Sequence, residues 1–358
     1  MRAGQVVVGV VIVLALLLAA CGQAAPAAAP TQAPAAAPKP AAGAKVEYPA
    51  MSLKLGQPFN PDHVVAMGMQ KFADLLSEQS GGKLKVEVFS SGSLVTGKNE
   101  LEALTTGIVD FGSVVPVYHP GELPFLNETT LFQLLYSYKS MPTLFQRARP
   151  QLEQELAKQK IKLISHYPFT MGFYLQKAID PKNPDFTGQK MRSPGGATTD
   201  IIRQFGGSTV DMPSPDIPVA LRTGVVQGLS TSLSSWDTLG IMEDVPYAYY
   251  GIYTVGFGSF LGMQEAKYNA LTPAVLQLIE KVARESEVWA YDNDQKQEGL
   301  VIKKAQNNPK VKPHQLTDEE ELAWRTKAKP VIDVFAKRYG DMSGQFVKLA
   351  EEINAQVK

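Results

Sequence analysis

The fold is decided by residues 189–230, QKMRSPGGATTDIIRQFGGSTVDMPSPDIPVALRTGVVQGLS, in which short apolar runs alternate with helix-like stretches. The pattern predicts strands near 189–192, 209–212 and 226–230, with helices near 199–205 and 215–223 between them. Strand–helix alternation of this kind favours an α/β layout with a mainly parallel sheet.

The same alternation extends outward in both directions. Upstream, strands are expected at 51–55, 83–89, 108–115, 162–167 and 173–179, and helices from an N-cap at Asp62 to Gly81, at 100–106 and at 152–160. Downstream, we expect a strand at 252–261, a long helix from Pro273 to about 307, and helices at 318–339 and 343–357. Because the pattern restarts after residue 167, a second lobe is predicted.

The N-terminus has the form of an export signal. Arg2 precedes an uncharged apolar run, 6–20, which is shorter than the roughly 20 residues needed to span a bilayer. The run ends in Leu18-Ala-Ala-Cys21 and resembles the lipobox of bacterial lipoproteins. Residues 1–20 are therefore interpreted as a signal peptide and Cys21 as a lipidation site. The alternative is an ordinary secretory signal followed by a chance cysteine.

The rest of the leading segment is expected to be an extended tether. From Gly22 to Lys45, 17 of 24 residues are Ala or Pro, a composition that cannot bury a core. The tether is assigned to 21–45 together with the lipidated cysteine. No cysteine follows, which excludes disulfides and cysteine metal sites in the body.

Charge and motifs exclude several functions. The chain has 35 basic and 35 acidic residues, and the part after residue 45 has 32 and 35, so no nucleic-acid partner is expected. Gly92-Ser-Leu-Val-Thr-Gly-Lys98 matches most of a phosphate-binding loop, but Asn99 replaces the hydroxyl residue that would hold Mg²⁺. No Gly-x-Ser-x-Gly or His-Glu-x-x-His motif occurs, so we expect no catalytic residue, metal or cofactor. His63, just after Asn60, opens the first helix, where backbone amides can face a cleft, and both are binding candidates.

Residues 185–228 contain a pattern of spaced residues, D-x-x-G-x-K-x-R, then F-G, then A-L-x-x-G-x-V-x-G. It is formed by Asp185, Gly188, Lys190, Arg192, Phe205, Gly206, Ala220, Leu221, Gly224, Val226 and Gly228. This pattern resembles that of a known family, the DctP-like substrate-binding subunits of tripartite ATP-independent periplasmic (TRAP) transporters. Looser matches extend the resemblance over about residues 51–310.

The resemblance implies an α/β fold of two periplasmic-binding-protein-like lobes, with crossing strands and a long hinge helix. We assign 46–165 plus about 252–285 to lobe I, and 166–251 plus about 286–358 to lobe II with the hinge and C-terminal helices. In the family, the arginine that ends K-x-R forms a salt bridge with the ligand carboxylate, and the match gives this role to Arg192. A planar guanidinium can donate two parallel hydrogen bonds to a carboxylate.

Departures from the family pattern indicate the ligand. Many members have a second arginine on the strand before K-x-R, where this chain has Thr170-Met-Gly-Phe-Tyr-Leu-Gln176. A dicarboxylate is therefore disfavoured, and we expect a less polar pocket. Tyr174 and Trp236 are the candidate walls, although each fits a core position equally well, and Gln176 and Thr231 are candidate polar contacts. Ser230 replaces a glutamate that holds a cation in some relatives, which favours no metal.

These observations predict a lipid-anchored, extracytoplasmic receptor for a small organic monocarboxylate, aromatic or branched. Its partners would be the small and large integral membrane subunits of the transporter, and the membrane through its lipid. Two alternatives stay open at this point. One is a solute-binding lipoprotein of an ATP-driven importer, and the other is an exported enzyme with Arg192 as substrate clamp and His166 or Tyr174 as acid and base.

Overall fold

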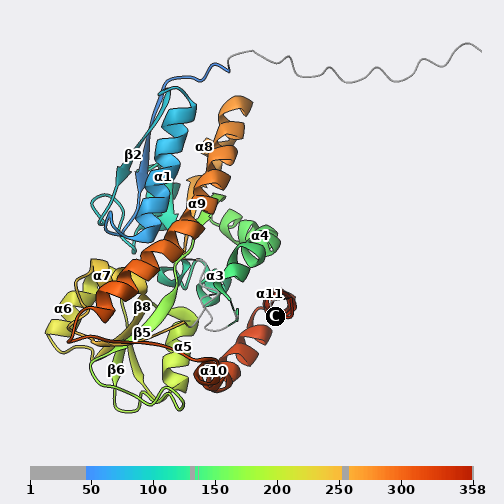
Figure 1. Ribbon diagram of the computed structural model, residues 1–358. Helices are drawn as coiled ribbons and strands as arrows, with labels where there is room; N and C mark the ends of the chain where they lie inside the picture. Colours follow the sequence, from blue (N-terminus) through green and yellow to red (C-terminus); the bar gives the residue numbers. More distant parts are fainter. Residues whose placement is uncertain (1–45, 130–133, 136, 252–257, 357–358) are drawn as a thin grey trace, which may run out of the picture. The chain divides into compact units, whose positions relative to one another are not determined.

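The computed structural model describes residues 46–129, 134–135, 137–251 and 258–356. The expected signal peptide, Cys21 and the tether lie outside these residues. The described chain is built on two β-sheets with helices on both sides (Figure 1).

The first sheet has the strand order β2-β1-β3-β10-β4. Its strands are β1 (Met51–Gly56), β2 (Leu84–Phe89), β3 (Phe111–Val114), β4 (Ile161–Tyr167) and β10 (Ser259–Gln264). Strand β1 is parallel to β2 and β3, whereas β10 is antiparallel to β3 and β4. Of the strand expected at 252–261, residues 252–257 lie outside the described residues, and the described part, β10, begins at Ser259.

The second sheet has the order β11-β9-β5-β8-β6-β7. Its strands are β5 (Met171–Leu175), β6 (Lys190–Ser193), β7 (Ser208–Asp211), β8 (Gly228–Ser232), β9 (Tyr247–Tyr250) and β11 (Lys312–Gln315). Strand β6 is parallel to β7 and β8, and β5 is antiparallel to β8 and β9. Strand β11 pairs in parallel with β9.

The chain passes between the lobes along crossing strands. It leaves the first sheet at β4 and enters the second at β5, and it returns from β9 to β10. Each of the strands that arrive in this way, β5 and β10, is antiparallel to both of its neighbours in the sheet. The prediction of a mainly parallel sheet is therefore wrong in this respect: both sheets are mixed, because a strand that arrives from the other lobe enters in the opposite direction.

The helices of the first lobe are α1 (Val64–Gln79), α2 (Glu100–Thr105), α3 (Pro124–Glu128), α4 (Met141–Ala157) and α8 (Glu265–Asn269), with 3₁₀ turns η1 (Pro116–Tyr118) and η2 (Tyr138–Ser140). The N-cap of α1 is His63 rather than Asp62, since its Nδ1 accepts a hydrogen bond from the Val65 amide at 3.2 Å. Helix α4 begins 11 residues before the predicted start, because Pro142 is tolerated in its first turn and Pro150 lies inside the helix.

In the second lobe, α5 (Gly196–Gln204), η3 (Ser214–Asp216), α6 (Ile217–Arg222) and α7 (Leu233–Thr238) cover the sheet. The predicted alternation in the decisive stretch is confirmed element by element. Phe173, Phe186, Phe205 and Trp324 form the apolar core on one side of this sheet, and Tyr174, Leu229 and Trp236 belong to the core on the other.

The long helix α9 (Pro273–Gln306) belongs to both lobes (Figure 1). Its first turns bury Val275 and Val282 in the core of the first lobe, and its last turns bury Val301 and Ala305 in the core of the second. This arrangement confirms the expected hinge helix.

The C-terminal helices are α10 (Asp318–Arg338) and α11 (Asp341–Asn354). The sequence grouped both with lobe II. Helix α11, however, buries Phe346 and Ile353 in the same core as Leu144 and Phe145 of α4. It therefore packs on the first lobe, and α10 connects the two, with Trp324 in a lobe II core and Phe335 beside α11.

Candidate functional site

A cavity lies between the lobes, where parallel strands of both sheets end. The first lobe contributes the segments after β1 and β3, and the second contributes the ends of β6 and β8 and the turn after β7. Ligands of open α/β sheets bind at the carboxyl ends of the strands. The lining residues are Phe59, Val115, Pro116, Val117, Tyr118, Phe169, Met171, Arg192, Pro194, Ser214, Thr231, Ser232, Ser235 and Gly258.

Arg192 is the one charged side chain among the described lining residues. It lies on β6 and is only 1% exposed. Its Nε and Nη2 donate to the Met212 carbonyl at 2.9 and 2.7 Å, and its Nη1 donates to the Ser230 carbonyl at 2.6 Å. A guanidinium has five N–H donors, so one donor on each terminal nitrogen is not used by these carbonyls.

No carboxylate of the described chain forms an ion pair with Arg192. Burial lowers the pKa of Arg192, while Tyr118, Asp211 and Asp216 act against this decrease. An arginine stays protonated even so. The site therefore holds a buried positive charge whose desolvation is only partly offset by Asp211 and Asp216, neither of which forms an ion pair with it, and a bound anion would offset more of it.

The remainder of the cavity is mostly apolar. Phe59, Val115 and Val117 come from the first lobe, and Phe169 and Met171 come from the crossing segment and β5. The centres of water molecules can occupy about 30 Å³ of it, compared with the ~10–15 Å³ that one water requires. As it stands, the cavity has room for only a few water molecules.

Direct hydrogen bonds hold the lobes together around the cavity. His63 Nε2 lies 3.1 Å from Ser232 Oγ, and the Val64 amide donates to Ser234 Oγ at 3.2 Å. Since His63 Nδ1 accepts the Val65 amide, its Nε2 carries the proton and donates to Ser232. Burial lowers the pKa of His63 to about 3, so this contact is made by a neutral imidazole.

Two further contacts join the lobes. Asn60 Nδ2 donates to the Thr238 carbonyl at 3.1 Å. Tyr118 Oη lies 3.1 Å from Ser214 Oγ and accepts the Ser214 amide at 3.2 Å. These bonds define a closed arrangement of the two lobes.

Comparison with known families identifies the chain at this point. Residues 55–338 match the model of the family "Bacterial extracellular solute-binding protein, family 7" (DctP). The chain belongs to this family. The family comprises substrate-binding subunits of TRAP transporters, so this protein is a TRAP solute receptor.

Curated relatives and solved structures agree. The receptor is 27% identical to the C4-dicarboxylate-binding periplasmic protein DctP of Rhodobacter capsulatus, over 86% of this chain and 97% of that protein. It is 25% identical to the C4-dicarboxylate-binding protein DctB of Bacillus subtilis, over 79% and 83% of the two chains.

Among solved structures, a marine metagenome TRAP solute-binding protein specific for pyroglutamate matches with a TM-score of 0.77 at 19% identity, over 85% of this chain and all of that one. A protein from Rhodoferax ferrireducens with bound malonate matches with a TM-score of 0.76 at 21% identity, over 85% and 98%. These likenesses confirm the two-lobe α/β fold.

The structure brings only some of the predicted site residues together. Arg192 and Thr231 both line the cavity. Asn60 and His63 line an adjoining pocket, which shares Phe59, Tyr118, Ser214 and Ser235 with the first.

Three predicted residues lie elsewhere in the receptor. Tyr174 and Trp236 are fully buried in a core, with ring centroids 4.9 Å apart, and the Trp236 indole donates to the Val245 carbonyl. They do not wall the cavity, so that prediction is corrected. Gln176 is exposed just after β5 and is not a lining residue of the cavity. Its backbone N–H donates to the backbone carbonyl of Gln227.

The residues of the enzyme alternative are also separated. His166 stacks on Phe145 with centroids 4.5 Å apart, and burial lowers its pKa to about 3. Neither His166 nor Tyr174 is a lining residue of the cavity.

In the part of the chain that the structure describes, no group of three His, Cys, Asp or Glu residues is arranged to hold a metal ion.

An aromatic wall of the cavity, formed by Phe59, Tyr118 and Phe169, was not predicted from the sequence. A signal for two of them was present. Phe59 follows β1 and Tyr118 follows β3, at the carboxyl ends of two parallel strands, which is where this class of sheet binds ligands.

Proposed function

We propose that this receptor captures a small organic monocarboxylate with an aromatic or branched remainder and delivers it to the membrane subunits of its transporter. The single observation that carries the ligand class is Arg192, a buried cation that forms no ion pair with a carboxylate of the described chain and is the one charged group in the described lining. A carboxylate would accept from the guanidinium donors that Met212 and Ser230 leave available, beside the Tyr118 hydroxyl, which also interacts with Arg192.

The rest of the lining supports an apolar remainder. Phe59, Val117, Phe169 and Met171 offer apolar contact, and Thr231 offers one hydroxyl. A second carboxylate of the ligand would find no second cation among the described lining residues, and its desolvation would oppose binding.

The relatives support an organic acid as ligand. The relatives named above include a C4-dicarboxylate-binding protein, one specific for pyroglutamate and one with bound malonate. Pyroglutamate has one carboxylate on a compact ring, and this chemistry fits a pocket with one arginine and apolar walls.

We further propose that the mature receptor is anchored outside the cytoplasm through a lipid on Cys21, with residues 21–45 as tether. No helix of the described part of the chain has the length and apolar character needed to cross a bilayer. Replacing Cys21 with Ser should release the protein from the membrane fraction and abolish incorporation of a labelled fatty acid. Unchanged incorporation in this variant would contradict the assignment.

Calorimetry and native mass spectrometry test the ligand class. Protein purified gently should carry a co-purified acid, and titration with pyroglutamate, phenylacetate, 3-methyl-2-oxobutanoate and malonate should favour the monocarboxylates. Arg192→Ala should weaken carboxylate binding by about 2–4 kcal/mol, because a desolvated charge pair is lost.

The matched control is Arg149→Ala. This arginine also donates to backbone carbonyls, at Leu163 and Ile164, but is not a lining residue of the cavity. It should leave affinity unchanged. Tight malonate binding with no monocarboxylate binding, or an unchanged affinity in Arg192→Ala, would refute the proposal.

A further inference from the structure

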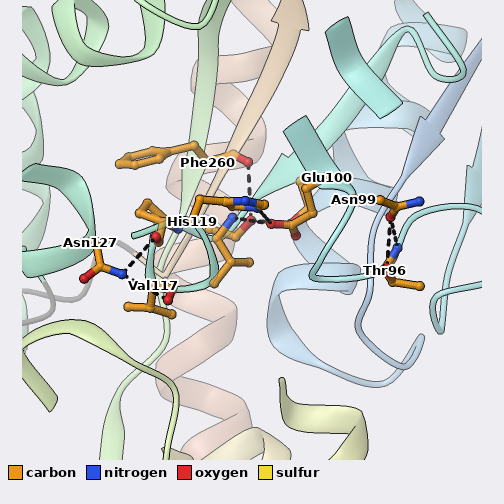
Figure 2. A network of polar contacts seen from close by, with 11 residues as sticks. Thr96, Asn99, Glu100, Val117, His119, Asn127 and Phe260 are labelled. Atoms are coloured by element: carbon orange, nitrogen blue, oxygen red, sulfur yellow. Dashed lines mark hydrogen bonds and ion pairs between the residues drawn. The ribbon is translucent and has the colours of Figure 1, made fainter. Parts of the chain in front are cut away.

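Glu100 is a fully buried carboxylate in a network of polar contacts next to the first-lobe residues that line the ligand cavity (Figure 2). It is the first residue of α2 and receives three hydrogen bonds. Ser113 Oγ donates to Oε1 at 3.1 Å, the Val115 amide donates to Oε2 at 2.9 Å, and His119 Nε2 lies 3.1 Å from Oε2. Ser113 Oγ in turn lies 2.7 Å from Ser259 Oγ on β10.

Glu100 therefore connects α2, β3 and the residue after η1. Burial raises the pKa of Glu100, and the hydrogen bonds and charge of its partners act in the opposite direction. A buried carboxylate with both oxygens in use holds its partners in one geometry, because any displacement leaves it unsatisfied.

The segment between these partners is the first-lobe wall of the cavity. Val115 and His119 are held by Glu100, and Val115, Pro116, Val117 and Tyr118 line the cavity. Asn127 Nδ2 adds bonds to the Pro116 and Val117 carbonyls, at 3.3 and 3.0 Å (Figure 2).

The same segment is where the second lobe docks. Tyr118 accepts the Ser214 amide. At Gly195, a Cβ atom would come 2.7 Å from the Val117 carbonyl oxygen, so the start of α5 approaches this carbonyl as only glycine allows. A shift of the wall by a few tenths of an ångström would therefore change both the cavity and the lobe contact.

From this geometry we infer that Glu100 is a positioning residue for ligand capture: by fixing Val115 and His119 it sets the place of the 115–118 wall, and so the lifetime and the size selectivity of the bound acid. The inference rests on the proposed function for the ligand class. Glu100 touches no ligand and acts through the wall.

The test compares Glu100→Gln with Glu155→Gln. Glu155 lies on α4, is likewise buried, with 3% exposure, and pairs with Lys158 just after that helix, but it is not a lining residue of the cavity. Both variants should lower thermal stability. Stopped-flow and calorimetric titration with pyroglutamate and with the larger phenylacetate should give, for Glu100→Gln only, an affinity weaker by about tenfold, expressed in the dissociation rate.

Selectivity separates positioning from a general structural role. In Glu100→Gln the ratio of phenylacetate to pyroglutamate affinity should rise, because a loosened wall admits the larger ring, whereas Glu155→Gln should keep the ratio of the natural protein. An unchanged ratio and dissociation rate in Glu100→Gln would overturn the inference. If this variant does not fold, His119→Gln, which removes one of the three bonds, takes its place with the same expectations.

Hydrogen exchange of the ligand-free protein keeps this test independent of the ligand class. The Val115 amide should exchange faster in Glu100→Gln than in Glu155→Gln, and equal exchange rates would overturn the inference that Glu100 holds the 115–118 wall in place. If neither probe binds the natural protein, the monocarboxylate proposal fails, and the exchange measurement still decides whether Glu100 holds the wall.

Discussion

Asp294 on the hinge helix should make the receptor less stable as the pH rises from about 4 to 7. Its side chain is almost fully buried, and its Oδ2 has no hydrogen-bond partner. Glu298, one turn later, has an unpartnered buried Oε1, and no basic side chain of the described chain forms an ion pair with either residue. Burial raises the pKa of Asp294 to about 7 and raises the pKa of Glu298 as well.

The sign of the effect follows from proton binding. Folded Asp294 keeps its proton up to about pH 7, whereas in the unfolded chain it ionises near 3.8. The stability that the protonated form provides is present below the unfolded value and is lost as the pH rises through the folded one. A difference of about three pKa units corresponds to at most on the order of 4 kcal/mol, of which roughly half falls between pH 5 and 7.

The assay is urea unfolding at pH 5, 6, 7 and 8, for the natural protein and for Asp294→Asn. His63 and His166 act in the opposite direction, because burial lowers their pKa values and their stability is lost as the pH falls. Glu287, whose pKa burial raises to about 7, acts in the same direction as Asp294. The informative quantity is therefore the difference in unfolding free energy between the two proteins at each pH.

That difference should move by up to about 2 kcal/mol in favour of Asp294→Asn between pH 5 and 7. Asp292→Asn, an exposed position on the same helix, is the control and should show no such movement. A difference that stays constant with pH would refute the reasoning, since it would mean that Asp294 is ionised in the folded protein throughout.

Two other substitutions separate the core from the site. Trp236→Phe should lower stability by about 1–3 kcal/mol, through the lost indole hydrogen bond to Val245 and the reduced contact with Tyr174, while calorimetric affinity for pyroglutamate stays the same. A large loss of affinity in a variant that stays folded would contradict the assignment of Trp236 to the core and would indicate that it contacts the ligand. Asn60→Ala removes the bond to the Thr238 carbonyl and should weaken the same affinity by about 3- to 10-fold, mainly by faster dissociation. An unchanged dissociation rate would show that this contact does not hold the closed form.

The fold could be predicted because its signals are local. Alternation of strands and helices, the glycines between them and the length of α9 are visible in the sequence, and the structure reproduces them. The antiparallel entry of β5 and β10 could not be predicted from periodicity, because strand direction depends on the path between the lobes. Helix α4 was partly hidden by Pro142 and Pro150.

The site was less predictable than the fold for a physical reason. All five residues of β5 are buried, so alternation does not show which side chains face the other lobe, and Tyr174 was placed on the wrong side. Trp236 lies on α7 and packs against Tyr174, so its predicted place was wrong as well. Arg192 and Thr231 lie in the cavity, whereas Phe59 and Tyr118 come from loops whose approach depends on the tertiary fold.

The division of the cavity between the lobes determines what kind of ligand can favour closure. Arg192 and Thr231 belong to the second lobe, and Phe59 and the 115–118 wall belong to the first. A ligand favours the closed form only through contacts that it makes better there than in the open form. An acid with a carboxylate and little else would gain its main contact from one lobe, and would bind without stabilising closure. An acid whose apolar remainder reaches the first-lobe wall gains contacts that exist only when the lobes meet, so selection by size and selection by closure are the same event.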